Sequence, residues 1–475
     1  MYSRRIVVTG MGAVTPIGNS VGEFWQALLD TRSGVAPVRA FAIDGFRPSY
    51  ASEVKDFAPD RAGLPRKKLK VMGRHAQLAF CAALEAWSDA GLATATDSTA
   101  RATDSRATAT DSRATATDFT ATATDSTATA TDPRAQDRSR IGVILGIGML
   151  SADVMELGRT FYAAAHASST NGSQSEAADS FDTAAFGRSA ASEMLPLWLL
   201  RHIPNLAAAH ISIALDAQGP SNTITTGCVS GANALGEAAR LIARGAADVV
   251  LAGGADARVS PLAMLRYRDL GWLATRDDVE PAAVSAPFDE DAAGFVNGEG
   301  AGIIVLEALD HARARGARVY AELAGYGAAN DAHAFLEPHP DGRAIAHSVS
   351  VCFERSGLNS TDADVVFSPA TGVPAFDRAV ASALTKTFDS SRPATTATRS
   401  VVGHTHAAST ALDCIAAIKS IGESKLPATL NLRRPIANLA FVTGAPYAAD
   451  ISTAVVSAYG FGGHAAALAW QRCSS

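Results

Sequence analysis

Cys228 is the residue whose type and position most directly suggest covalent chemistry. It follows a run of β-forming residues at 223–227 and begins a segment of small residues that favours a helix. On such a strand-to-helix turn we expect the sulfur to be exposed at the apex, where the positive end of the helix dipole favours the thiolate. Position alone leaves two interpretations open, a nucleophile or an inert, buried thiol.

Two segments near the C-terminus could assist such a nucleophile. His404 ends the segment Ser-Val-Val-Gly-His and could donate a hydrogen bond to a developing negative charge. Three glycines surround Phe461 at 460–463, so the backbone there can turn tightly and point its amides inward as an oxyanion hole. Each segment also fits a purely structural role, as a core histidine and as a turn.

The glycines near the N-terminus, Gly10 and Gly12, resemble the start of a dinucleotide-binding fingerprint. The third glycine of that fingerprint is missing, because position 15 is Thr15 and Pro16 follows it. We therefore expect no nucleotide cofactor.

Composition predicts a soluble globular enzyme of two layered domains. The chain has 475 residues, of which 47% are hydrophobic and 19% charged, and its formal net charge of -6 gives no basic footprint for nucleic acid. Five scattered cysteines without CxxC spacing predict reduced cytoplasmic thiols and neither disulfides nor a zinc site. We expect no signal peptide and no membrane span, because the chain lacks a suitable apolar segment.

Strand-like and helix-like segments alternate along the chain in two comparable series, which predicts mixed α/β layers. Strands are predicted at 5–9, 140–146, 223–226, 248–252, 295–306, 318–326 and 451–458, and helices at 21–30, 74–90, 206–215, 229–244 and 308–315. Residues 93–134 differ, since they repeat a seven-residue unit close to ATATDSR six times. The unit is too polar to form a buried seam, so it predicts a disordered surface loop without a catalytic role.

Several motifs, in order and over nearly the whole chain, resemble those of the β-ketoacyl-acyl-carrier-protein synthase II family. Only the repeat falls outside the resemblance. The motifs are VVTGMGAVTPIG at 7–18, Pro204-Asn205, Gly219-Pro220, Thr226-Gly-Cys228, Ala252-Gly-Gly254, Pro287-Phe-Asp289, Gly294-Phe295, GEGAG at 298–302, Gly403-His404 and GFGG at 460–463.

The resemblance implies a thiolase fold of the α/β class, with two similar halves, each a mixed five-stranded sheet between helices (layered α-β-α-β-α). The implied domains are residues 1–272, which carry Cys228 and the inserted repeat, and residues 273–475, which carry His404 and the GFGG loop. The resemblance makes Cys228 the acyl-accepting nucleophile and Phe461 a gate whose amide joins that of Cys228 in the oxyanion hole.

The resemblance makes His404 the second of two catalytic histidines, which stabilises the enolate formed from a malonyl thioester. Asp413 stands at a supporting position where the family usually has glutamate.

The active-site pattern departs from the family at several positions. Pro369 stands where the family has its first catalytic histidine, and proline has neither an ionisable side chain nor a backbone N–H. Arg399 replaces the family's lysine, and Val380 stands where a glutamate is common. His464 and Ala465 replace the asparagine after the GFGG loop.

The loss of one of two enolate-stabilising donors would slow condensation on the order of 10²–10³-fold unless another group substitutes. His406 and His464 are the candidates by proximity in the sequence.

Two functional hypotheses remain open. In the first, the chain is an acyltransferase of fatty-acid or polyketide biosynthesis that takes an acyl group from an acyl carrier protein onto Cys228, followed by decarboxylative Claisen condensation with malonyl carrier protein. In the second, it is a chain-length-factor-like, non-condensing subunit of a ketosynthase heterodimer. The retained cysteine favours the first hypothesis, and the missing histidine favours the second. Both imply a dimer, either with a second copy or with a second ketosynthase.

Overall fold

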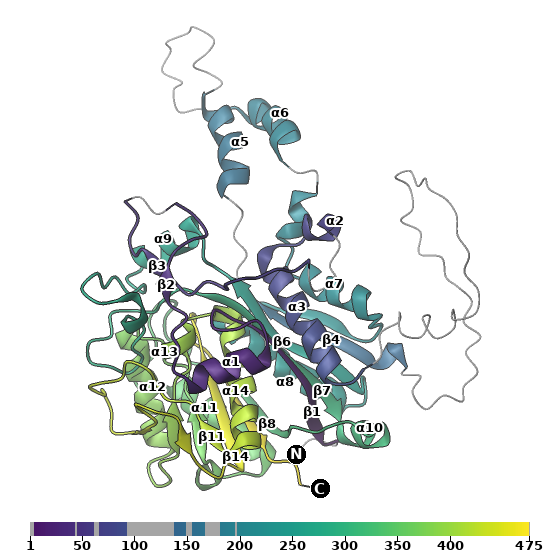
Figure 1. Ribbon diagram of the computed structural model, residues 1–475, viewed down its shortest axis with the longest axis vertical. Coiled ribbons are helices and arrows are strands. Elements are labelled where there is room, and N and C mark those ends of the chain that lie inside the picture. The colour runs from purple at the N-terminus through teal and green to yellow at the C-terminus, as the bar shows by residue number, and fades with distance from the viewer. Residues whose placement is uncertain are drawn as a thin grey trace, which may run out of the picture.

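The computed structural model describes residues 4–42, 45–60, 66–92, 137–148, 154–166, 181–194 and 197–474, and its long strands form one mixed sheet with two parts (Figure 1). The first part has the order β5-β4-β6-β7-β1, and the second has the order β8-β15-β14-β9-β10 with the two-residue strand β12 at its edge. The strands of the first part are β1 (Ile6–Val14), β4 (Ile141–Ile147), β5 (Ser221–Ile224), β6 (Val249–Ala257) and β7 (Glu299–Ala308). Those of the second part are β8 (Ala321–Asn330), β9 (Val365–Phe367), β10 (Ala394–Thr396), β12 (Ala440–Phe441), β14 (Thr453–Tyr459) and β15 (His464–Gln471).

The two parts repeat one pairing pattern. In the first, β5, β4 and β6 are parallel, and β7 and β1 follow antiparallel. In the second, β10, β9 and β14 are parallel, and β15 and β8 follow antiparallel. Among the described strands, the two parts pair where Val7 and Val8 of β1 lie beside β8. This repeat confirms the predicted thiolase-type architecture, with β5 equivalent to β10.

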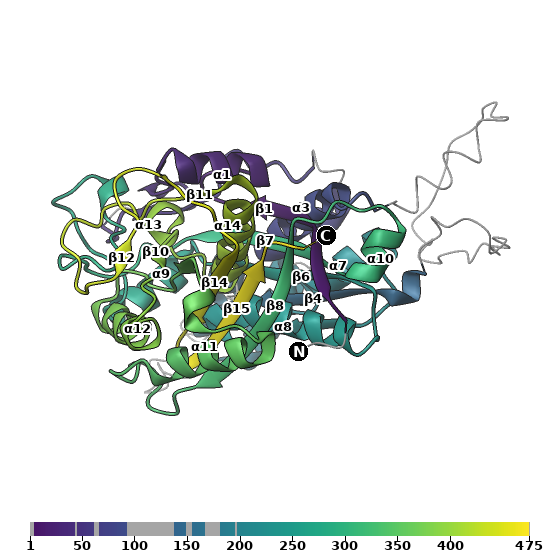
Figure 2. The same cartoon turned by 90° about the horizontal axis from the view of Figure 1, so that it is seen from below.

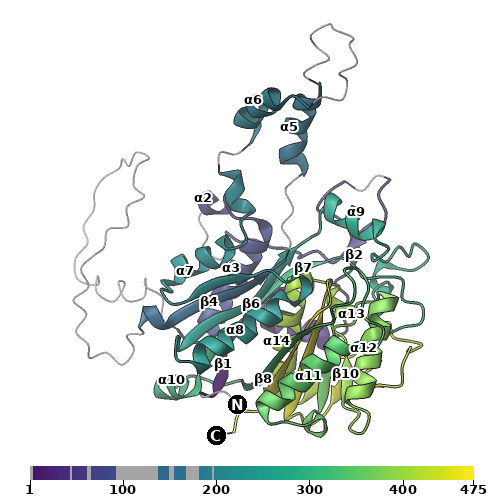
Figure 3. The same cartoon turned by 180° about the vertical axis from the view of Figure 1, so that it is seen from behind.

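Helices form three layers around the two parts of the sheet. The helices α3 (Arg74–Asp89) and α7 (Leu206–Leu215) pack on the first part, and α11 (Arg343–Ser356) packs on the second with α12 (Pro374–Thr387) beside it (Figure 3). Between the two parts lie α8 (Ser230–Ala243) and α14 (Ser409–Glu423), which contact each other. Figure 2 shows the order α14, then β14 and β15, then α11.

The remaining elements are short or peripheral. Helices α5 and α6 pack on each other and stand away from the sheets (Figures 1 and 3). The bounds are α1 (Val21–Leu29), α2 (Arg66–Leu69), α5 (Val154–His166), α6 (Thr183–Glu193), α9 (Pro261–Asp269), α10 (Leu309–Ala314), α13 (Arg399–Val402), β2 (Ala36–Pro37), β3 (Tyr50–Ala51), β11 (Lys425–Leu426) and β13 (Tyr447–Ala448). Among the helices that the structure describes, none combines the length and apolar character needed to cross a membrane.

Most predicted elements lie within a few residues of the observed ones, and α7 has its predicted bounds. The strand predicted at 295–306 is wrong at its start, since β7 begins at Glu299. The residues before it form isolated bridges instead, with Phe295 paired to Leu273 and Asn297 to His404. The predicted repeat loop at 93–134 lies outside the described residues, and the division of the chain at residue 272 stays a prediction.

The glycines of β1 allow α3 to approach the sheet closely. A Cβ atom at Gly10 would lie 2.2 Å from the carbonyl oxygen of Ala86, and one at Gly12 would lie 1.9 Å from that of Ala82. Larger residues would push α3 away from β1. The Gly-Met-Gly motif therefore serves helix packing.

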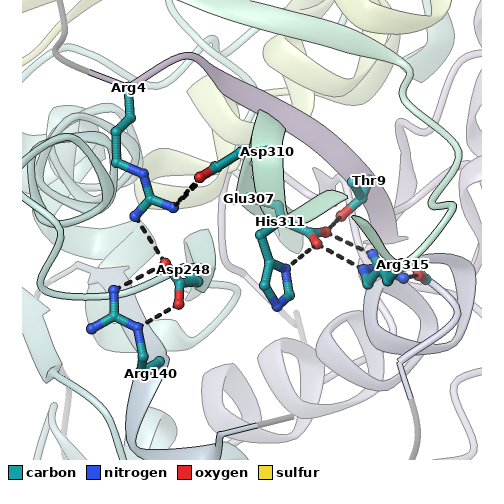
Figure 4. A network of polar contacts seen from close by, with 9 residues as sticks. Arg4, Thr9, Arg140, Asp248, Glu307, Asp310, His311 and Arg315 are labelled. Atoms are coloured by element: carbon teal, nitrogen blue, oxygen red, sulfur yellow. Dashed lines mark hydrogen bonds and ion pairs between the residues drawn. The ribbon is translucent and has the colours of Figure 1, made fainter. Parts of the chain in front are cut away.

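Two carboxylates anchor the ends of the first part of the sheet (Figure 4). The buried Glu307 on β7 accepts hydrogen bonds from Thr9, His311 and Arg315 at 2.6–2.7 Å. Asp248 accepts hydrogen bonds from Arg4 at 2.8 Å and from Arg140 at 2.9 Å. These contacts tie the start of β1 and the start of β4 to the neighbouring β6 and β7.

We predict that Asp248→Asn lowers the free energy of unfolding in a pH-dependent way. Hydrogen bonds from Arg140 and Arg4 lower the pKa of Asp248 to about 2, against burial, which would raise it. The carboxylate's contribution is therefore fully present above about pH 4 and lost as pH falls toward 2. We expect a loss of about 1–2 kcal/mol at pH 7, measured by urea unfolding.

The difference between Asp248→Asn and wild type should shrink as the pH is lowered from 5 to 3. Asp310→Asn is the matched control, because Asp310 is 74% exposed and shares only the Arg4 contact. A difference that stays constant with pH would contradict the role assigned to Asp248.

Candidate active site

Cys228 lies at the start of the buried central helix α8. The strand β5 leads into a 3₁₀ turn, Gly227–Val229, and α8 begins at the next residue. Gly227 has φ 62°, a left-handed conformation that glycine adopts without a steric penalty. The Ser230 hydroxyl accepts a hydrogen bond from the Thr226 amide at 2.8 Å and donates one to the Gly227 carbonyl at 2.7 Å. The predicted strand-to-helix turn is present and held by its own side chains.

The predicted exposure of the sulfur at this apex is wrong. Cys228 is only 5% exposed, because loops from the second part of the sheet cover the turn. Burial raises the pKa of the Cys228 thiol to about 12; Asp256 also raises it, whereas Arg258 and Arg399 lower it. The group is therefore a thiol at neutral pH, and it needs a proton acceptor before it can attack a carbonyl.

His404 is positioned to be that acceptor. Its Nε2 lies 3.3 Å from Cys228 Sγ. Burial lowers the pKa of His404 well below its usual value, and Arg399 and Arg258 add to this effect, so the imidazole is neutral. Backbone hydrogen bonds to Val296 and Gly298, at 2.8 and 3.0 Å, fix the strand-like segment around it. The 3.3 Å contact allows Nε2 to accept the thiol proton, but burial disfavours both charged products, so the transfer has to accompany attack of the sulfur on a carbonyl.

The loop after His404 repeats the geometry of the cysteine turn. A 3₁₀ turn, His406–Ala408, precedes α14, and the Ser409 hydroxyl accepts a hydrogen bond from the Thr405 amide at 3.1 Å. His406 has φ 51°, at the position where the first turn has Gly227. The two turns contact each other. The repeat in the fold thus brings together residues that are 176 positions apart in the sequence.

Pro369 lies where the register of the sequence predicts it, beside the cysteine and the histidine. Cys228, His404 and Pro369 line a cavity of about 10 Å³, closed by Phe376, Tyr459, Phe461 and other apolar side chains. This space holds about one water molecule. The buried Asp377 fixes the loop by accepting hydrogen bonds from the amides of Phe288, Thr371 and Gly372.

Arg399 and Asp413 form a buried ion pair that supports the same loop. Arg399 Nη1 lies 3.1 Å from Asp413 Oδ2 and donates to the Ser368 carbonyl at 2.8 Å. Thr398 donates a hydrogen bond to the other carboxylate oxygen. The pair therefore connects the Pro369 loop to α14, and no lysine is needed for that connection.

Phe461 closes the cavity from the GFGG loop. Its ring stacks on Trp272 with centroids 3.9 Å apart and packs edge-on against Phe376 at 5.5 Å. A Cβ atom at Gly460 would lie 3.2 Å from Cys228 Cβ, so glycine allows the loop to approach the nucleophile. The oxyanion hole formed by the amides of Cys228 and Phe461 stays a prediction.

His406 and His464, the two candidates for the missing hydrogen-bond donor, have different surroundings. His406 is buried, its ring centroid lies 4.4 Å from that of His404, and its Nε2 lies 2.7 Å from Asn297 Oδ1. His464 is partly exposed on β15 and contacts Asn330 at 3.3 Å. Neither is among the residues that line the cavity opposite Pro369.

Sequence reasoning missed a buried ion pair behind the cysteine. Arg258 Nε contacts Asp256 Oδ1 at 2.9 Å, and Arg258 Nη1 donates to the Tyr267 hydroxyl at 3.1 Å. The available signal was Asp-Ala-Arg at 256–258, separated by three residues from the apolar strand predicted at 248–252, since polar residues near the end of a buried strand commonly line a site. The positive charge of Arg258 and the negative charge of Asp256 offset each other near the Cys228 sulfur.

We predict that Phe461→Ala raises the rate at which N-ethylmaleimide modifies Cys228. The ring closes a cavity too small for the reagent, and its removal opens a path to the sulfur. The rate is measured by peptide mapping over time, and a several-fold increase is expected. Phe335→Ala is the control, because that ring is 87% exposed on a neighbouring loop. Equal rates in both variants would contradict the closing role of Phe461.

Comparison with known proteins gives consistent similarities along the chain. The models "Beta-ketoacyl synthase, N-terminal domain" and "Beta-ketoacyl synthase, C-terminal domain" match residues 3–131 and 97–312, and residues 320–433, respectively. The 3-oxoacyl-acyl-carrier-protein synthase 2 of Synechocystis sp. is 31% identical over 478 residues, covering 99% of each chain. The protein of the same name from Coxiella burnetii is 30% identical over 476 residues, again covering 99% of each chain.

Two solved structures are similar over their whole length. The ishigamide ketosynthase/chain length factor has 28% sequence identity and a TM-score of 0.78, covering 99% of this chain and 100% of that chain. A beta-ketoacyl synthase from Burkholderia phymatum has 27% identity and a TM-score of 0.77, with the same coverage.

Proposed function

Because this chain belongs to the beta-ketoacyl synthase family of condensing acyltransferases, we propose that Cys228 accepts an acyl group from the thioester of an acyl carrier protein. The observation that supports this most directly is the 3.3 Å contact between Cys228 Sγ and His404 Nε2 in a water-poor cavity. The relatives named 3-oxoacyl-acyl-carrier-protein synthase 2 support the choice of carrier.

The proposed acylation proceeds in one addition and one elimination. His404 Nε2 accepts the thiol proton, and the sulfur attacks the thioester carbonyl, with the positive end of α8 stabilising the thiolate. The amides of Cys228 and Phe461 hold the oxyanion. The carrier thiol then leaves and takes the proton from His404, and the acyl group remains on Cys228.

The entering acyl group must displace Phe461. The cavity of about 10 Å³ cannot hold a chain of carbon atoms while the ring stacks on Trp272. Gly462 and Gly463, with φ 79° and 77°, allow the GFGG loop to change its backbone conformation. Opening of this loop is therefore part of the proposed acylation.

We predict that the protein gains the mass of one acyl group when it is incubated with acyl-acyl-carrier-protein, and that Cys228→Ala does not. The measurement is intact-protein mass with a panel of acyl chain lengths. Cys352→Ala is the matched control, because that thiol is also buried but lies on α11 and does not line the cavity. A folded protein that is never acylated by any donor would refute the proposal.

Condensation with malonyl carrier protein is proposed to be slow in this chain. His404 can donate one hydrogen bond to the malonyl thioester, but Pro369 offers none from the opposite wall. Neither His406 nor His464 lines that wall, so neither replaces the missing donor without movement of the loops. The acyl-transfer half of the chemistry is complete, and the malonyl half lacks one donor.

We predict that Pro369→His accelerates condensation on the order of 10²-fold, because it restores the second donor to the enolate. The measurement is the rate of formation of the β-ketoacyl product from acylated enzyme and malonyl carrier protein. Pro369→Ala controls for the loss of the proline ring. Equal rates for the histidine and alanine variants would show that the position does not limit condensation.

A second candidate function is that of a non-condensing subunit in a ketosynthase heterodimer. Pro369 favours it, as does the similarity to a structure described as a ketosynthase/chain length factor. Three apolar side chains, Leu197, Leu199 and Ile213, are between 54% and 71% exposed, and a partner chain could cover them. Acylation of the isolated chain on Cys228 would favour the first function, and acylation only of a co-purified partner would favour the second.

A further inference from the structure

We propose that Cys228, His404 and His406 together bind one zinc ion, which holds the nucleophile in a capped state that no acyl group can enter. One possible ligand atom from each of the three side chains lies within 4.8 Å of the others, and all three residues are buried. The metal site depends only on these three side chains, whereas the capped state rests on the proposed acylation of Cys228.

The distance between the first two ligands fits a shared ion. Cys228 Sγ and His404 Nε2 are 3.3 Å apart. In a tetrahedral zinc site with Zn–S near 2.3 Å and Zn–N near 2.0 Å, a sulfur and a nitrogen lie about 3.5 Å apart. Thiolate and imidazole are ligands that zinc prefers, whereas magnesium and calcium prefer oxygen.

The third ligand is oriented by the contacts around it. Asn297 Nδ2 donates to the Arg258 carbonyl at 2.7 Å, so its Oδ1 faces His406 Nε2, which lies 2.7 Å away and must be the donor. This hydrogen bond leaves Nδ1 of His406 without a proton and with a free lone pair. Histidines that bind metals commonly donate their other ring N–H in this manner.

The backbone of His406 is strained in a way that its role as a structural residue does not explain. Its φ of 51° lies in the left-handed region, and the equivalent position of the cysteine turn is glycine with φ 62°. A glycine would satisfy the turn without strain. Strained residues with long side chains cluster at functional sites, where the side chain is needed.

Charge and space around the cluster allow the ion. The nearby cations Arg258 and Arg399 are paired with Asp256 and Asp413, so they do not add net positive charge. His404 Nδ1 is buried and has no hydrogen-bond partner within the described part of the chain, so the ring can adjust its tautomer to a ligand. The cavity of about 10 Å³ borders Cys228 and His404 but not His406, and it has room for one water as a fourth ligand on that side of the ion.

Binding is a substitution of a proton by the metal. The Cys228 thiol loses its proton to the buffer and forms a Zn–S bond, and the neutral histidines add their lone pairs, so one proton is released per ion. The bound ion withdraws electron density from the sulfur and obstructs its approach to a thioester, so attack is suppressed. Removal of the ion by a chelator returns the thiol and its capacity for acylation.

The test uses the full chain after chelator treatment and desalting. Zinc is added together with a fluorescent zinc indicator as competitor, and bound metal is counted by mass spectrometry after gel filtration, with magnesium as a negative control. We expect one zinc ion per chain, with an affinity reduced at least about tenfold in His406→Gly and in Cys228→Ser. His406→Gly removes the imidazole while glycine still accepts the left-handed φ of the turn, and circular dichroism checks that the variant is folded.

His464→Ala is the matched control and should bind zinc as the wild type does, since His464 lies outside the cluster. Wild-type protein without zinc, or a His406→Gly variant that retains wild-type affinity, would overturn the proposal. Acylation of the zinc-free protein is measured separately by intact mass. Acylation without zinc binding would refute only the metal site, and zinc binding without acylation would refute only the proposed function.

Discussion

The structure depends on the meeting of two buried helix N-termini between the two parts of the sheet. Helices α8 and α14 follow equivalent strands, and each begins with a 3₁₀ turn in which a serine hydroxyl accepts a backbone hydrogen bond. Because the two parts of the sheet repeat each other, these turns face one another across the centre of the molecule. One turn supplies the cysteine and the other supplies the histidines.

Burial of this meeting point determines the protonation of its groups. The same desolvation that raises the pKa of the Cys228 thiol lowers the pKa of His404. Both groups are therefore neutral at rest, and charge appears only when a proton moves between them. Each nearby arginine is paired with a carboxylate, so the site contains fixed charges of both signs without a net excess.

The Pro369 loop is held in place by contacts that do not involve the side chain at position 369. Asp377 holds the loop through three backbone amides, and Arg399 holds it through the Ser368 carbonyl. None of these contacts uses the side chain at position 369. Proline at position 369 therefore leaves the loop in place, and its side chain offers no hydrogen-bond donor to the cavity that Cys228 and His404 line.

Residue types and their spacing are enough to predict the alternation of strands and helices, the position of Cys228 on a strand-to-helix turn, and the absence of an imidazole at Pro369. These are local properties, set by residue type and by spacing over a few positions. The sequence also gave the wrong expectation of an exposed sulfur, because the loops that cover Cys228 come from the other half of the chain.

The residues that surround the cysteine could be identified only from the folded chain. His406 lies two positions after His404 in the sequence. No spacing pattern shows that either histidine lies close to Cys228. The ion pair of Arg258 with Asp256 and the strained backbone of His406 became visible in the same way. The physical reason is that distant segments become buried and touch each other when the two repeated halves pack together. Local sequence patterns do not specify that packing.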